Sequence, residues 1–441
     1  MEVSREVVAL LIVAFFAVAT FTVGWRNAIP ATLILCLGGF SFSIISLIDT
    51  SVIHYGIAAP GPSLSIVSVL VLALLMSRKY SPSVRATRRF ALTFGVLLLF
   101  AILVIWGGSS EKWAGVILLF VGILCVICGR LIAQDYDARL EGAIAAAAFI
   151  VILSHTLAAA GQLVGTVVVF NDLKLANDSI ISFHRMTGLY NHPSVLGKIV
   201  LFLLAFLLPM TTSTNRRTRL VAGTSIALGV VGTLLTVSRT NIIAIGIAMA
   251  VWFIFGRIGL GIGQRLRAIL VLIFGLIISK DTVEARFASD SEGGDRPELL
   301  TTGLNQLGQH FWLGFGPNSY STNVGRYDYL ASIGYPVHNS FVHMGVEIGV
   351  PLAILFFVPL AIATLVSIKG LRSQGLTRAR ATAFMAILPG TLMMIWTGWG
   401  IIAESTLPLW CLAVGYLWGV PHSDSAPTFS RQTADRRGVA A

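Results

Sequence analysis

Charged residues are scarce in this sequence of 441 residues. Asp, Glu, Lys and Arg make up 12%, against roughly 25% in an ordinary soluble domain. Hydrophobic residues make up 56%, and the mean hydropathy is +0.83. A soluble fold of this size has too little interior to bury so much apolar surface, and a disordered chain would be polar and charge-rich. The composition excludes both classes and indicates an integral membrane protein.

Cysteine is also rare, and the sequence offers little to a metal ion. The four cysteines all lie inside apolar runs, so we expect small buried hydrophobes rather than a disulfide framework. Cys125 and Cys128 form a CxxC pair, but a structural zinc site takes four ligands. Asp135 and Asp137 spell DxD in a short polar connection, and we interpret them as a helix cap and a solvated pair. No metal and no cofactor are predicted.

Apolar runs of about 17–25 residues are long enough to cross a bilayer as helices. The sequence contains about 13 such runs, which predicts an all-α, polytopic transmembrane bundle of about 12–13 spans. The runs lie near residues 7–25, 28–48, 63–77, 90–107, 113–133, 143–170, 193–211, 219–237, 240–256, 267–279, 338–367, 382–402 and 406–420.

Most of the 31 Lys and Arg residues fall in one set of short connections, such as 78–89, 216–219 and 369–380. The positive-inside rule places this set and the C-terminus in the cytoplasm. The pI of 9.9 then reports topology, and no nucleic-acid partner is predicted. We expect a multi-pass inner or plasma membrane protein, with a transmembrane domain at 1–420 and a disordered cytoplasmic tail at 421–441.

Two connections on the opposite, extracytoplasmic side are longer than a turn: residues 171–192 and about residues 280–337. Long connections in a compact protein are usually functional or disordered. In the larger one, Pro297 occupies a helix-start position, and leucines recur after it at near-helical spacing. This connection is therefore predicted to contain short helices.

Arginines on the extracytoplasmic side run against the positive-inside rule. Arg239 stands in a turn between two apolar runs, and Arg185 and Arg296 lie in the two long connections. A cation at that depth needs an anionic partner, although a snorkelling arginine at a helix end is the alternative for Arg239. Because the planar guanidinium fork matches phosphate oxygens, the three arginines together predict a diphosphate site.

His338 lies where the larger connection re-enters the membrane. A neutral imidazole can accept a proton from a hydroxyl near physiological pH, although a lone histidine at a helix start is more often only an interfacial polar residue. Residues 338–367 form one apolar run that is expected to open as a long helix, with a Gly349-Val350-Pro351 break beside Glu347. Glu347 would stand about 180° around that helix from His338 and is expected to support the site, as is Asn339. His155, a single polar residue in an apolar run, is interpreted as a satisfied core histidine.

Three stretches together resemble the O-antigen ligase and polymerase superfamily, integral membrane glycosyltransferases that use polyprenyl-diphosphate-linked glycans. The stretches are Arg185-Met-Thr-Gly-Leu-Tyr-Asn191-His-Pro-Ser, Thr236-Val-Ser-Arg239-Thr, and the region from Arg296 to Gly349 with Trp312-Leu-Gly-Phe-Gly316, His338-Asn339-Ser-Phe and Glu347-Ile-Gly349. The chain departs from the family pattern in its Asn-His-Pro-Ser element and at Thr240, where the family has glycine.

The resemblance implies metal-independent glycan transfer at the extracytoplasmic face. Arg185, Arg239 and Arg296 would hold the donor diphosphate, and His338 would act as base on the acceptor hydroxyl. Asn191, Asn339 and Glu347 would support these groups. The expected partners are the bilayer, a polyprenyl-diphosphate-linked oligosaccharide donor, a glycan or lipid acceptor, and other polysaccharide assembly proteins. Polymerase and ligase both stay open, because both would use the same residues.

A transporter or flippase of a lipid-linked glycan or an anionic solute is the alternative from another class. Such a protein should carry ionisable residues near the middle of the membrane, on broken helices. The apolar runs of this chain are almost free of charge, and the charged groups gather at their ends. The pattern therefore favours a one-sided site over a transport path.

Overall fold

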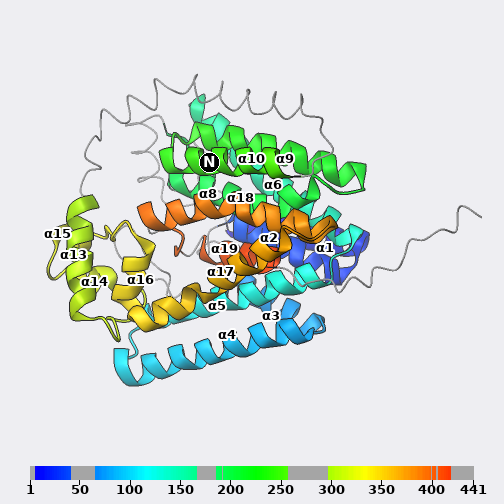
Figure 1. Ribbon diagram of the computed structural model, residues 1–441. Helices are drawn as coiled ribbons and strands as arrows, with labels where there is room; N and C mark the ends of the chain where they lie inside the picture. Colours follow the sequence, from blue (N-terminus) through cyan, green and yellow to red (C-terminus); the bar gives the residue numbers. More distant parts are fainter. Residues whose placement is uncertain are drawn as a thin grey trace, which may run out of the picture.

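The computed structural model describes residues 5–40, 65–165, 185–190, 192–256, 296–398, 400–403 and 406–418. Throughout these ranges the regular structure is helical, with no strand. The long helices lie side by side, and short helices extend one end of the bundle (Figure 1). The predicted all-α bundle is confirmed.

Seven of the described helices are long and apolar enough to cross a membrane. They are α4 (Pro82–Ala101) with its π-helical extension η1 (Ile102–Trp106), α5 (Ser110–Gln134), α6 (Ala138–Leu163), α8 (Pro193–Met210), α9 (Arg216–Leu235), α17 (Val350–Gly370) and α18 (Gly375–Thr397). Shorter helices add to the bundle: α1 (Arg5–Val23), α2 (Trp25–Gly39), α3 (Ile66–Ser77), α10 (Arg239–Phe255) and α19 (Leu407–Trp418). The expected run at 267–279 and the expected tail at 421–441 lie outside the described residues.

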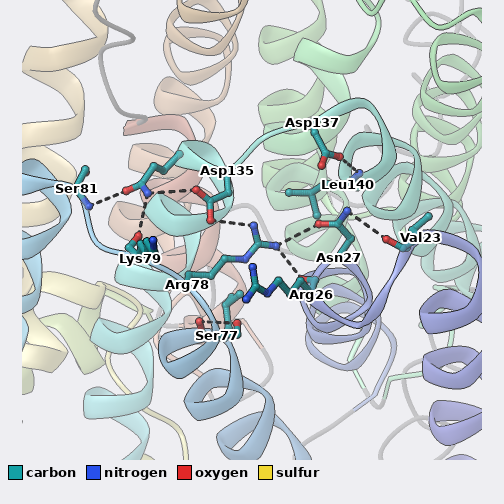
Figure 2. A network of polar contacts seen from close by, with 12 residues as sticks. Val23, Arg26, Asn27, Ser77, Arg78, Lys79, Ser81, Asp135, Asp137 and Leu140 are labelled. Atoms are coloured by element: carbon teal, nitrogen blue, oxygen red, sulfur yellow. Dashed lines mark hydrogen bonds and ion pairs between the residues drawn. The ribbon is translucent and has the colours of Figure 1, made fainter.

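One end of the bundle gathers arginines, and we call it the basic end (Figure 2). Arg78, after α3, forms an ion pair of 3.0 Å with Asp135, after α5, and donates to the carbonyl of Arg26 at 2.8 Å. Asp137 accepts from the amide of Leu140 at 2.7 Å and so caps α6. The predicted cap is confirmed at Asp137, and the half-exposed Asp135 gains an ion pair with Arg78 that the sequence did not predict.

The opposite end, which we call the loop end, carries residues 296–349 as an outer segment. Its short helices are α13 (Arg296–Gln309), α14 (Tyr320–Val324), α15 (Tyr329–Ser332) and α16 (Ser340–Ile348), seen at the left of Figure 1. The segment is fastened to the α4–α5 connection. Trp106 Nε1 donates to the Leu313 carbonyl at 2.6 Å, and Asn318 Nδ2 donates to the Glu111 carbonyl at 3.2 Å.

The apolar run expected over 338–367 forms two helices, α16 and α17, which meet at the expected Gly349-Val350-Pro351 break. Gly349 has φ of 78°, a backbone conformation that favours glycine. The turn at 311–316 clamps this joint: Phe315 N donates to the Val346 carbonyl at 3.0 Å, and Val350 N donates to the Phe311 carbonyl at 2.8 Å. A Cβ at residue 349 would collide with the Trp312 carbonyl. Two motifs far apart in the sequence therefore form one joint, which fixes how α16 leaves the bundle.

We predict that Gly349→Ala destabilises the protein by about 1–3 kcal/mol, since alanine is both strained and crowded there. The measurement is the thermal unfolding midpoint of the purified chain in detergent. Gly246→Ala is the matched control, because a Cβ on Gly246 of α10 meets nothing within 4 Å and alanine favours a helix. Equal midpoints for Gly349→Ala and the parent chain would contradict the account of the joint.

Candidate functional site

The loop at residues 185–190 is held by a buried glutamine of α6. Gln162 Oε1 accepts from the amides of Thr187 at 2.8 Å and Gly188 at 3.1 Å. Its Nε2 donates to the Gly188 carbonyl at 2.8 Å. One side chain thereby replaces the hydrogen bonds that water would give to irregular backbone. The sequence-based prediction missed Gln162, although a buried amide in the last turn of an apolar helix was a signal.

His155, two turns earlier on α6, holds the next residue of the same loop. The Leu189 amide donates to His155 Nδ1 at 3.2 Å, so Nε2 carries the proton and donates to the Gly38 carbonyl at 2.9 Å. The ring also stacks on Tyr190, with centroids 5.1 Å apart. Both ring nitrogens are bonded, which confirms the interpretation of His155 as a satisfied core histidine.

The loop at residues 185–190 places Arg185 against the turn before α10. Met186 N donates to the Leu235 carbonyl at 3.1 Å, and Arg185 Nε donates to the Thr236 carbonyl at 3.3 Å. The turn is strained, since Val237, a β-branched residue, has φ of 49°. Arg239 follows as the first residue of α10 and is half-buried. Two of the three predicted arginines thus belong to adjoining loops.

The start of α8 adjoins the start of α10. Asn241 Nδ2 donates to the Ser194 carbonyl at 2.8 Å, and Gly197 lies so close to Asn241 that a Cβ there would collide. His192 caps α8, with Nδ1 accepting from the Ser194 amide at 3.1 Å. One turn further, the buried Lys198 donates from Nζ to Ser194 Oγ at 3.2 Å. The first turns of α8 therefore add a histidine and a lysine beside the arginine turn.

His338 is brought to the same end by the packing of α13 on α16. Gly303 of α13 lies against Val337, where a Cβ would come within 3.1 Å of the valine side chain. Asn339 caps α16 by accepting from Phe341 N at 3.0 Å and Val342 N at 3.1 Å. Ser340 Oγ donates to the Gly398 carbonyl, after α18, at 2.7 Å. These contacts hold the backbone on both sides of His338.

Burial, together with the positive charges of Arg296 and Lys198, lowers the pKa of His338 to about 4, although a backbone hydrogen bond at Pro336 acts in the opposite direction. The ring is therefore neutral at pH 7. Its Nδ1 is buried and has no hydrogen-bond partner among the described residues. His192 lies in the electrostatic field of Lys198, Arg185 and His338.

We call Arg185, His192, Lys198, Arg296 and His338 the outer basic cluster. Its members come from the 185–198 segment, the start of α13 and the start of α16. The positive charges of Arg185, Lys198 and Arg296, on two of these segments, attract an anion to the place where the segments meet. An unprotonated imidazole in that place can accept a proton.

The other predicted supporting residues have separate positions. Glu347 Oε1 accepts from Tyr320 N at 3.1 Å and lies 3.5 Å from His343 Nε2, so it anchors α14 to α16. Asn339 acts on the backbone of α16. Asn191 lies outside the described residues. Within the part of the chain that is described, no three His, Cys, Asp or Glu side chains are grouped as a metal site would need.

The described helices form the all-α bundle of a polytopic membrane protein, with basic side chains and a neutral histidine at one end. Residues 224–357 match the family model described as O-antigen ligase, and this match supports the resemblance of the chain to the O-antigen ligase and polymerase superfamily. The matched stretch includes Arg239, Arg296 and His338 and leaves Arg185 outside. No curated protein was found to match the chain.

We predict that Gln162→Leu loosens the 185–190 loop, because the buried amides of Thr187 and Gly188 lose their acceptor. Amide hydrogen exchange of this peptide in detergent should accelerate at least tenfold, while exchange in α19 stays unchanged. Ser154→Ala on the same helix is the control, since Ser154 Oγ bonds only to the Val151 carbonyl of its own helix. Unchanged protection of the loop in Gln162→Leu would show that the hydrogen bonds of Gln162 do not hold it.

Proposed function

We propose that the chain transfers a glycan from a polyprenyl-diphosphate-linked donor to an acceptor hydroxyl at the extracytoplasmic face, without a metal ion. One observation carries this proposal: the neutral His338 stands in the field of Arg296 and Lys198, which lie far from each other in the sequence. A diphosphate supplies the charge that this arrangement favours, and a neutral imidazole suits the removal of a hydroxyl proton.

In the proposed reaction, the acceptor oxygen forms a bond to the anomeric carbon while the bond from that carbon to the diphosphate oxygen breaks. His338 accepts the hydroxyl proton, and polyprenyl diphosphate leaves with the electron pair. A single displacement inverts the anomeric carbon. Arg185, Arg239 and Arg296 hold the diphosphate and stabilise the charge that grows on it. The guanidinium groups thereby provide the positive charge that a metal ion would otherwise bring.

The proposed orientation follows from the basic end. If the basic end faces the cytoplasm, the cluster at the loop end faces the opposite compartment, where a carrier lipid in the outer leaflet presents its diphosphate. The acceptor is a second lipid-linked glycan in a polymerase and a lipid or other acceptor in a ligase. The position of the cluster at one end of the bundle favours this reading over the transporter, which needs charged groups along a path.

We expect His338→Ala to reduce transfer about 10²–10⁴-fold, the usual contribution of a general base, and Arg239→Ala to reduce it strongly as well. Glycan length and carrier-bound intermediates would be compared on gels of membranes from a deletion strain complemented with each variant. Short, single-repeat glycan left on the carrier indicates a polymerase, and full-length glycan left on the carrier indicates a ligase.

The control for this experiment is His310→Ala, because His310 packs on Phe315 in the outer segment, with ring centroids 3.9 Å apart. It should retain transfer within about threefold, as a surface substitution away from the reacting groups does. Wild-type transfer by a well-expressed His338→Ala protein would exclude His338 as the base and reopen the transporter reading.

The pH dependence provides an independent test, because only the unprotonated His338 can act as base. With its pKa lowered to about 4, kcat/KM should stay level from neutral pH downward and fall only as the pH approaches that value. A bound diphosphate offsets the nearby positive charges and raises the pKa of His338. The acid limb of kcat, which reports the donor complex, should therefore lie at higher pH than that of kcat/KM. Coincident limbs, or a limb of kcat at lower pH, would contradict the proposed coupling.

A further inference from the structure

Lys198 is the one member of the outer basic cluster that lies inside a membrane-spanning helix. It is 8% exposed, and its neighbours on α8 are apolar residues such as Leu196 and Ile199. Six residues separate it from His192, which corresponds to about 9 Å along a helix. A cation at such a depth is costly unless it meets an anion or lines a polar path. The position therefore needs an explanation beyond the helix itself.

The protein gives the Lys198 ammonium one hydrogen-bond acceptor in the described part of the chain, the hydroxyl of Ser194 at 3.2 Å. An ammonium group carries three N–H donors, so the one acceptor at Ser194 does not use all of its hydrogen-bonding capacity. The ion pairs formed among the described residues join Arg78 to Asp135 and His343 to Glu347, and neither involves Lys198. Among the described residues, the charged group that acts together with Lys198 on His338 is another cation, Arg296.

The ammonium also points toward the loop end of the bundle. A Cβ on Gly400 would collide with Lys198 Nζ, so the side chain reaches the connection between α18 and α19. Gly398 of the same connection accepts from Ser340, two residues after His338. Ser194 in turn links Lys198 to the ring of His192, with Ser194 Oγ 2.7 Å from His192 Nδ1. The lysine therefore reaches from α8 to the connection that holds the start of α16, close enough to His338 to act on it electrostatically.

We propose that Lys198 is a further ligand of the donor and binds a phosphate oxygen of the lipid-linked diphosphate from the bilayer side. This inference rests on the proposed function and adds a fourth cation to Arg185, Arg239 and Arg296. The depth of Lys198 favours a phosphate over an acidic sugar, because the phosphates of a lipid carrier stay next to its hydrocarbon chain while the sugars extend away from it. A compact ammonium serves as a point charge for a phosphate oxygen.

The test uses the full chain in nanodiscs, with Lys198→Gln as the neutral variant and Lys198→Arg as the charge-conserving variant. Loss of a charged hydrogen bond to phosphate should raise the KM for the lipid-linked donor about 10–100-fold and leave the KM for the acceptor unchanged. Inorganic pyrophosphate should raise the thermal midpoint of the parent chain and of Lys198→Arg more than that of Lys198→Gln. An unchanged donor KM and an unchanged pyrophosphate effect in Lys198→Gln would overturn the assignment.

Two comparisons distinguish a failure of the proposed role of Lys198 from a failure of the proposed function. If Arg239→Ala loses the pyrophosphate effect and Lys198→Gln keeps it, only the role of Lys198 is wrong. If the parent chain itself shows neither transfer nor a response to pyrophosphate, the proposed function fails with it. Glu404, four residues after Gly400, lies outside the described residues. A double variant Lys198→Gln, Glu404→Gln with the donor KM of the parent chain would identify Lys198 as a structural counter-ion and overturn its role as a ligand.

Discussion

Irregular backbone inside or near a bilayer must find its hydrogen-bond partners within the protein, and this constraint shapes the loop end. Each break in the helical pattern there is matched by a specific acceptor or donor. Gln162 serves the loop that carries Arg185, and Asn241 serves the start of α8. Ser340 serves the connection after α18. The same contacts that satisfy the backbone also hold the segments that carry the candidate residues at the loop end. The candidate site therefore depends on how the irregular backbone finds its hydrogen-bond partners.

The composition and the long apolar runs were sufficient to predict the all-α bundle, because length and hydropathy decide which segments can span a bilayer. The break at Gly349-Val350-Pro351 could be expected from the sequence, but the turn at 311–316 that holds it is distant in sequence and could not. The ion pair of Asp135 was likewise not predicted, since its partner Arg78 follows a different helix. Local patterns predicted each element, whereas contacts between elements decided how the elements end.

The candidate site divides in the same way. Arg185, Arg239, Arg296 and His338 could be selected from the sequence because charge on the extracytoplasmic side is unusual. Gln162 and Lys198 could not be assigned roles, since a polar residue in an apolar run gains its meaning from the helix that faces it. The role proposed for Lys198 depends on its contacts with Ser194 and Gly400, and on the contact of the same connection with the start of α16.

One set of charges serves both halves of the proposed chemistry. Arg296 and Lys198 keep His338 unprotonated in the free protein, but a base with a low pKa is a weak one. When an anionic diphosphate occupies the cluster, it offsets those charges, and the pKa of His338 rises toward the range in which a base accepts a proton effectively at neutral pH. The base would then become strong only when the leaving group is in place. This coupling would favour transfer to an acceptor from a correctly bound donor, and it needs no metal ion and no moving part.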